Sequence, residues 1–210
     1  MRNAAGNNKK GKAMLRNYAA LTSSMLRPGA GYAQPTQPVP EKVTLDAPAL
    51  QVLTDFRHVT AIIILPGDTM DEAHRRMIQR GVRLLLVVDQ DRKVLGLITA
   101  NDILGEKPMQ VIAHRSVRRE ELLVRDIMTP QERLQVLHLE DVRAARVGHI
   151  VATLKAAGRQ HALVVEIDDS GRQTVRGMFS ATQIARQLGV TIHTSQVART
   201  FSEIEAMLAH

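Results

Sequence analysis

The stretch Gly81-Val-Arg-Leu-Leu-Leu-Val-Val-Asp89, followed by Val94-Leu-Gly-Leu-Ile-Thr99, decides the fold of this chain. The glycine at its start is a helix stop, and the run behind it is apolar enough to form a strand buried on both faces. The second segment is another β-rich run, and the charged turn of residues 90–93 joins the two. Together they predict a β-hairpin that directly follows a helix.

The sequence on either side of the hairpin completes one structural unit. A β-rich run over residues 59–65 precedes a turn and a helix, which has Met70, Ala73 and Met77 on one face. A short helix is predicted to start at Ala100, directly after the second hairpin strand. The predicted order of elements is therefore β-α-β-β-α.

The same order recurs in the second half of the chain, which makes the sequence an internal repeat. Its first strand is predicted at residues 134–139, and its hairpin strands at 161–166 and 175–180. Gly158 ends its helix as Gly81 ends the first one. The apolar face of this helix has the same spacing as in the first copy: Val147, Ile150 and Leu154.

One β-α-β-β-α unit leaves an apolar sheet face that its own helices do not cover. Two units can bury these faces against each other around a pseudo-twofold axis. We therefore predict an α+β fold in which two repeats pack sheet to sheet. Clefts between the repeats are then the expected place for a ligand.

Composition divides the rest of the chain. Residues 1–40 hold six basic side chains, no acidic ones and four prolines, which predicts a disordered basic tail and a Pro-rich linker. The first repeat is assigned to residues 41–125 and the second to 126–190. Residues 191–210 are expected to form an amphipathic helix that packs back on the repeats or contacts a second copy or a partner. Its apolar stripe consists of Val197, Phe201, Ile204 and Leu208.

Charge and composition exclude several classes of function. The net charge is +7, and because +6 belongs to the first 40 residues, the rest of the chain is nearly neutral. The chain has no cysteine and no histidine pair with metal-ligand spacing, so neither a metal site nor a cysteine nucleophile is expected. No apolar run reaches the roughly 18–20 residues of a membrane span. We expect a cytoplasmic protein that is not an enzyme.

The repeated motifs resemble a tandem pair of cystathionine-β-synthase (CBS) domains, known as a Bateman module. The matching residues are Gly81 to Asp89, Gly96-Leu-Ile-Thr-Ala-Asn-Asp102, Asp126-Ile-Met-Thr-Pro130 and Gly177-Met-Phe-Ser-Ala-Thr-Gln183. The resemblance implies a regulatory module, usually a homodimer, that binds an adenosine nucleotide or another adenosyl compound in its clefts. It also implies a separate effector protein that receives the signal.

Thr99 and Asp102 are the first candidates for binding this ligand. A hydroxyl and a carboxylate in the first turn of a helix could bind phosphate and ribose, and in the CBS family the aspartate holds the ribose. The same spacing is also typical of a capping box, which only starts a helix. Ser180 with Gln183 fits either role in the second copy. Because Gln183 lacks the charge of an aspartate, one good site is expected rather than two.

Further candidates follow from the resemblance. Arg83 matches a position that contacts phosphate in some nucleotide-binding members, and His161 lies beside its counterpart Gln160. Ile62 and Val87 are candidates for an apolar slot for adenine. Two alternatives remain open at this point: a ligand-free dimeric scaffold, and binding of nucleic acid or an anionic membrane through the basic tail.

Overall fold

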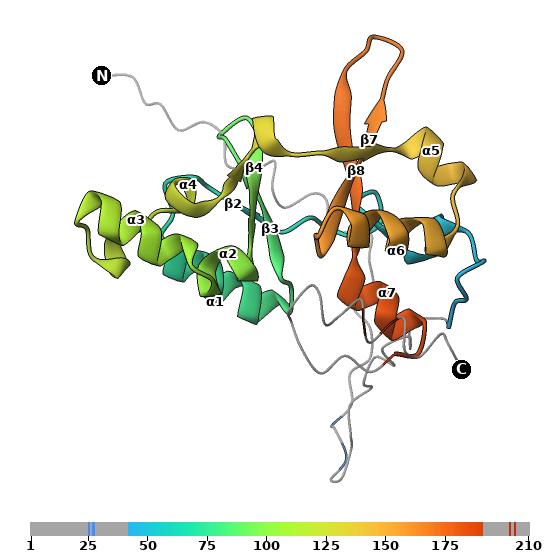
Figure 1. Ribbon diagram of the computed structural model, residues 1–210, viewed down its shortest axis with the longest axis horizontal. Coiled ribbons are helices and arrows are strands. Elements are labelled where there is room, and N and C mark those ends of the chain that lie inside the picture. Colours follow the sequence, from blue (N-terminus) through green and yellow to red (C-terminus); the bar gives the residue numbers. More distant parts are fainter. Residues whose placement is uncertain (1–24, 26, 28–41, 191–201, 203, 205–210) are drawn as a thin grey trace, which may run out of the picture. The chain divides into compact units, whose positions relative to one another are not determined.

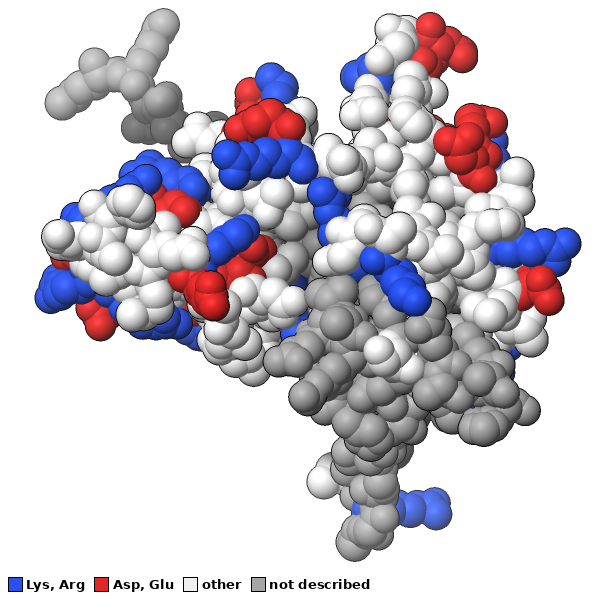
Figure 2. All heavy atoms as spheres, viewed as in Figure 1, with Lys and Arg blue, Asp and Glu red and all other residues white. Residues whose placement is uncertain are grey.

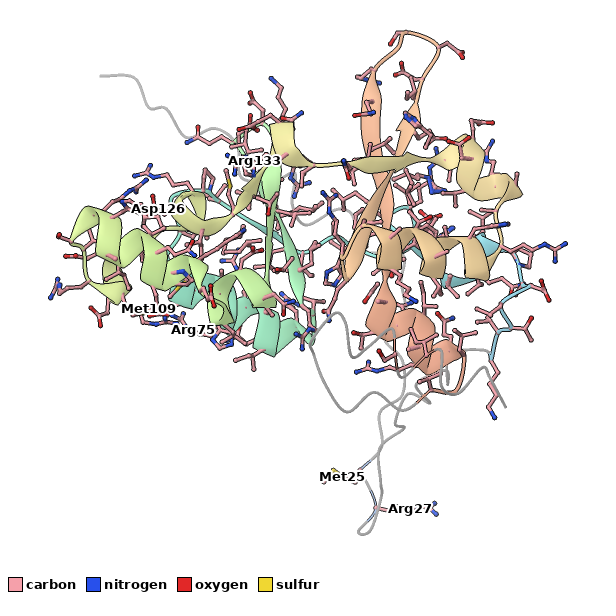
Figure 3. The ribbon with its side chains drawn as sticks, in the orientation of Figure 1. Met25, Arg27, Arg75, Met109, Asp126 and Arg133 are labelled. Atoms are coloured by element: carbon pink, nitrogen blue, oxygen red, sulfur yellow. The ribbon has the colours of Figure 1, made fainter. Side chains whose placement is uncertain are left out.

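The computed structural model describes residues 25, 27, 42–190, 202 and 204. The chain divides into two units, Met1–Pro38 and Val39–His210, and every helix and strand named below belongs to the second unit. Met25 and Arg27, labelled in Figure 3, are the described residues of the first unit, and both are exposed. The predicted basic tail and most of the predicted C-terminal helix therefore lie outside the described residues.

The first repeat has the predicted order of elements and one additional helix. The predicted helix is confirmed, because Met70, Ala73 and Met77 are all buried and Gly81 ends it in the left-handed conformation with φ of 63°. The elements are β2 (Ile63–Ile64), α1 (Met70–Arg80), β3 (Leu84–Val88), β4 (Val94–Thr99), α2 (Ala100–Leu104) and α3 (Lys107–Arg115).

The first strand is shorter than predicted. The N–H groups of His58 and Val59 both donate to the Asp55 carbonyl, at 3.0 and 2.9 Å, so the chain turns here instead of extending. Pairing with β3 therefore begins only at Ile63. The additional helix, α3, was not predicted.

The second repeat has the same order, again with one helix that the sequence did not predict, α5. Its first strand is also shorter than predicted. Gly158 ends α6 with φ of 59°, as expected from the first copy. The elements are β6 (Val136–His138), α5 (Leu139–Ala144), α6 (Val147–Ala156), β7 (His161–Ile167), β8 (Gln173–Ser180) and α7 (Ala181–Gln187).

Each repeat builds a three-stranded sheet, and a fourth strand comes from a segment outside it. The orders are β2-β3-β4-β5 and β1-β8-β7-β6. The fourth strands are β1 (Thr54–Asp55), which precedes β2 but pairs with β8, and β5 (Thr129–Pro130), which precedes β6 but pairs with β4. We call residues 42–55 and 122–130 the lead-in segments. The two repeats thus exchange their lead-in segments.

A glycine in each repeat makes room for the exchanged strand. A Cβ atom at Gly96 would lie 2.4 Å from the Thr129 carbonyl oxygen, and one at Gly177 would lie 2.5 Å from the Thr54 carbonyl oxygen. Any side chain at these positions would therefore collide with the backbone of the lead-in segment. This close approach explains why both copies of the motif carry glycine here.

The lead-in segments also complete the cores of the repeats to which they pair. Ala49 and Val52 are buried in the core of the second repeat. Leu122 and Ile127 are buried in the core of the first repeat. A short helix, α4 (Val124–Ile127), lies within the second lead-in segment.

A third core lies between the two sheets. All five residues of β3 are buried, and they alternate between two environments. Leu85 and Val87 pack against the helices, whereas Leu84, Leu86 and Val88 pack with Leu163 and other residues of the second sheet. In Figure 1, β3 and β4 accordingly have α1–α3 on the side away from β7 and β8. The α+β fold with sheet-to-sheet packing is confirmed.

One residue of the predicted C-terminal stripe is described, and it is part of the core. Ile204 has an exposed fraction of 0% and belongs to the core cluster of the second repeat. Its burial is what the packing-back alternative predicts for this position. Within the part of the chain that the structure describes, no helix has the length and apolar character needed to cross a membrane.

Candidate ligand-binding clefts

Two clefts lie between the repeats. The larger, cleft 1, has a volume of about 390 Å³ and is lined by the end of β4 and the start of α2 on one side, and by the start of β7 on the other. Cleft 2 has a volume of about 240 Å³ and is lined by the end of β8 and the start of α7, opposite the start of β3. Each cleft is therefore formed by the corresponding elements of the two repeats, with the roles of the first and second repeat reversed.

Thr99 and Asp102 both line cleft 1 and form a complete capping box at the start of α2. The Asp102 Oδ2 atom accepts from the Thr99 N–H at 2.8 Å and from its hydroxyl at 2.7 Å. In return the Asp102 N–H donates to Thr99 Oγ1 at 3.3 Å. The helix-capping role of this pair is therefore present.

The capping box does not use all of the Asp102 carboxylate. Its Oδ1 atom accepts from the Lys107 ammonium, which also donates to the Ile127 carbonyl at 3.4 Å. A carboxylate has about four acceptor positions. The two bonds from Thr99 and the one from Lys107 occupy three of them, which leaves one position at Oδ1. The side chain of Asp102 is 11% exposed. It could therefore accept one further hydrogen bond from a ligand in the cleft.

Sequence reasoning missed Lys107. Its ion pair with Asp102 links α2 to the first turn of α3, a helix that was not predicted. A lysine five residues after the aspartate was the available signal, but only the presence of α3 brings the ammonium back to the carboxylate.

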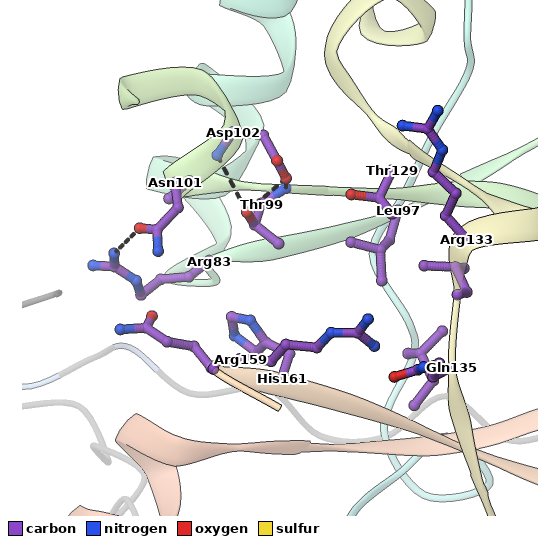
Figure 4. A pocket seen from close by; sticks show the side chains of 15 residues that line it. Arg83, Leu97, Thr99, Asn101, Asp102, Thr129, Arg133, Gln135, Arg159 and His161 are labelled. Carbon is purple, nitrogen blue, oxygen red and sulfur yellow. Dashed lines mark hydrogen bonds between the residues drawn. The ribbon is translucent and has the colours of Figure 1, made fainter. Parts of the chain in front are cut away.

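Arginines dominate the charge of cleft 1. Arg83 reaches the Asn101 amide oxygen at 3.4 Å, and its buried Nε atom has no hydrogen-bond partner. Arg133 and Arg159 also line the cleft, and no acidic partner for either is found among residues 42–190. Figure 4 shows Thr99, Asn101 and Asp102 on one wall, and Arg159 and His161 on the opposite wall.

His161, the first residue of β7, lines both clefts. Burial, and secondarily the positive charge of Arg83, lower the pKa of His161 from 6.5 to about 4, although the charge of Asp102 opposes this shift. Its imidazole is therefore neutral near pH 7 and can donate one hydrogen bond and accept another. Arg83 is likewise shared by both clefts.

Cleft 2 differs from cleft 1 in its polar groups. Ser180 makes no capping bond, and the Gln183 side-chain oxygen instead accepts from the Thr54 hydroxyl at 3.0 Å. The interpretation of Ser180 and Gln183 as a capping box was therefore wrong, because the lead-in strand provides another partner. Ile62 and Ser180 both line this cleft, and its lining contains no carboxylate.

Val87 lies elsewhere. Its exposed fraction is 0%, and it packs against the helices of the first repeat instead of lining either cleft. Side chains alternate along β3, so Val87 points to the face opposite Leu86, which does line cleft 2. The apolar side chains that line cleft 1 are Leu97, Ala100, Leu134 and Leu163.

Across the described residues, no group of three or more histidine, aspartate or glutamate side chains is placed to hold a metal ion.

Comparison with known proteins supports the fold. Residues 57–108 match the family model of the CBS domain. The fold is similar to the crystal structure of an uncharacterized conserved protein from Pyrococcus horikoshii, with a TM-score of 0.51 and 20% identity over 73% of this chain and 100% of that one. The match lies within the first repeat, and the fold of the two repeats together is that of a CBS pair.

Lower TM-scores were obtained for two further structures. One is CBSX2 of Arabidopsis thaliana in complex with AMP, with a TM-score of 0.47 and 17% identity over 67% of this chain and 94% of that one. Another is a putative signal-transduction protein with CBS domains from Burkholderia ambifaria, with a TM-score of 0.47 and 19% identity over 65% and 89%. The search of curated proteins found no match.

Proposed function

We propose that this CBS pair is a regulatory module that binds an adenosine nucleotide in cleft 1. The observation that carries the proposal is the pairing of an incompletely used carboxylate, Asp102, with arginines that lack acidic partners in one cleft of about 390 Å³. This volume lies within the range of small-molecule sites, roughly 300–1,000 Å³. The resemblance to CBS domains supports the choice of an adenosine ligand.

Each part of the ligand has a matching group in the cleft. A ribose hydroxyl would donate to the remaining acceptor position of Asp102. Phosphate oxygens would accept from the guanidinium groups of Arg83 and Arg159, whose planar donors suit them. Adenine would lie against the apolar side chains that line the cleft, Leu97, Leu134 and Leu163.

The module acts without catalysis in this proposal. A ligand in cleft 1 would contact both repeats, so its binding would favour one arrangement of the repeats over another. The shift is limited to the difference in the ligand's affinity for the two arrangements. We propose that a cytoplasmic homodimer passes this change to a separate effector protein.

Thermal unfolding with AMP, ADP, ATP, S-adenosylmethionine and a GTP control tests the proposal. A ligand present at about 100 times its Kd stabilises the native protein by roughly 2.7 kcal/mol, which raises Tm measurably. The variant Asp102→Asn should lose this ligand-induced rise. Because the substitution also weakens a capping box, each Tm is compared with that of the same variant without ligand.

Asp126→Asn is a closely matched control. Asp126 forms the same kind of capping contact, accepting from the Leu123 N–H at 3.0 Å, and pairs with Arg115 at 2.5 Å. Its side chain is 12% exposed, close to the 11% of Asp102, but it lines neither cleft. A rise in Tm that survives in Asp126→Asn and disappears in Asp102→Asn supports the proposal. No response to any adenosine compound at millimolar concentration contradicts it.

The ligand-free scaffold is the second candidate, and the complete capping box favours it. If Thr99 and Asp102 serve only to start α2, then both aspartate variants should be destabilised, and no adenosine compound should raise the Tm of the wild type or of either variant. Binding of polyanions through the basic tail is a separate activity. Figure 2 shows acidic and basic side chains interspersed over the described surface on this face, so the tail carries that alternative. Deletion of residues 1–38 would test it.

A further inference from the structure

Cleft 1 has an excess of positive charge. Three guanidinium groups line it, those of Arg83, Arg133 and Arg159, and they face one carboxylate, that of Asp102. Lys107, which lies outside the lining, already forms an ion pair with this carboxylate. The field inside the cleft is therefore positive, and low-dielectric walls strengthen such a field.

Several exposed arginines of this protein form ion pairs with acidic side chains of the described chain, whereas the arginines of cleft 1 do not. Arg75 pairs with Glu72, and Arg143 pairs with Glu140 at 3.1 Å. Arg133 and Arg159 have no such acidic partner within the described part of the chain. These two positive charges therefore remain available to an anion.

Arg83 adds a separate observation. Its Nε atom is buried without any hydrogen-bond partner, and its contact with Asn101 is long, at 3.4 Å. A buried N–H group without a partner is unfavourable, and it is uncommon in native proteins. Arg83 also lines cleft 1, and its guanidinium is the third one there without an acidic partner among the described residues.

We infer that cleft 1 selects its ligand by negative charge, and that Arg133 and Arg159 set the preference. Nucleoside di- and triphosphates then bind more tightly than AMP, and AMP binds more tightly than adenosine. S-Adenosylmethionine, which carries a sulfonium cation, is disfavoured by the same field. The inference rests on the proposed function, because it concerns which adenosine compound occupies that same cleft.

Isothermal titration calorimetry with the 210-residue chain tests the inference. The panel is adenosine, AMP, ADP, ATP and S-adenosylmethionine, measured without divalent cations at low and high salt. Affinity should rise with each phosphate, and the differences should shrink at high salt because salt screens charge. Arg133→Gln and Arg159→Gln should each lower the affinity for ATP about tenfold, the usual effect of losing one charge-assisted contact. They should barely change the affinity for adenosine.

Arg143→Gln is the matched control, because it removes the same charge from an exposed position on α5. The basic tail is identical in all these proteins, so any ATP bound there cancels in the comparison. Equal affinity for adenosine and ATP, or an equal loss for both ligands in the arginine variants, would overturn the inference and leave nucleotide binding intact. Failure of every compound to bind would instead contradict the proposed function.

Discussion

Acidification should destabilise this protein through His161. Because burial and Arg83 hold the pKa of this imidazole at about 4 in the folded protein, it stays neutral there down to nearly that pH. In the unfolded chain its pKa returns to about 6.5. Between these values the unfolded state binds more protons than the folded state, so the free energy of unfolding falls as the pH falls.

The size of the effect follows from the two pKa values. Above pH 6.5 the contribution to stability is fully present, and it is lost progressively as the pH falls towards 4. Between pH 7.5 and 4.5 the loss through this one residue amounts to about 2.5 kcal/mol. Such a loss is a large fraction of the stability of a typical domain, roughly 5–15 kcal/mol.

The assay is urea unfolding of the wild type and of His161→Gln at pH 7.5 and at pH 4.5. Other groups titrate equally in both proteins, so the difference between their pH dependences isolates His161. The wild type should lose about 2.5 kcal/mol more than the variant. His138→Gln, which removes an exposed imidazole from β6, is the control and should behave like the wild type. Equal losses in the wild type and His161→Gln would refute the reasoning.

Two further predictions concern the exchanged lead-in segments. Gly177→Ala should lower the free energy of unfolding by roughly 1–3 kcal/mol, because its Cβ collides with the Thr54 backbone, and urea unfolding would measure the loss. Gly67→Ala, with no atom within 4 Å of the added Cβ, is the control, and an equal loss in both would count against the steric explanation. Asp55→Asn should cost about 2 kcal/mol in the same assay, because Arg176 contacts Asp55 at 2.6 Å with both side chains mostly buried. An unchanged stability would mean that Glu166, 3.6 Å from Arg176, suffices as its partner.

Local patterns predicted the parts of the fold that depend on short-range periodicity. The apolar face of α1, its glycine stop and the two hairpins are encoded within windows of about 20 residues, and the repeat made each prediction twice. The exchange of β1 and β5 could not be predicted, because two-residue strands have no periodicity and their pairing joins residues over 120 apart in the case of Thr54 and Met178. The glycines at 96 and 177 were the only sequence signal of that close approach.

In the candidate site too, residues within predicted elements were identified, whereas residues brought there by tertiary packing were not. Cleft 1 brings together two pairs of predicted residues. Thr99 and Asp102 lie where a predicted strand ends and a helix begins, and Arg83 and His161 lie at the start of predicted strands. Val87 was misplaced because a fully apolar strand does not reveal which of its faces meets the helices. Lys107 went unrecognised as the partner of Asp102, and Arg133 as a member of the cleft, because the unpredicted helix α3 and the packing of the two repeats bring them there.

The exchanged lead-in segments mean that the covalent link between the repeats is not what holds them together. The link passes through residues 116–121, where Ser116 has a positive φ of 54° and most side chains are exposed. Cleavage of this connector would leave β1 paired with β8 and β5 paired with β4, so the two fragments would stay associated. A fragment with one repeat alone would lack the lead-in segment that pairs with its sheet, so a strand edge and part of its core would be exposed. The lead-in segment of a second fragment could bind there instead. The smallest autonomous unit of this protein is the pair.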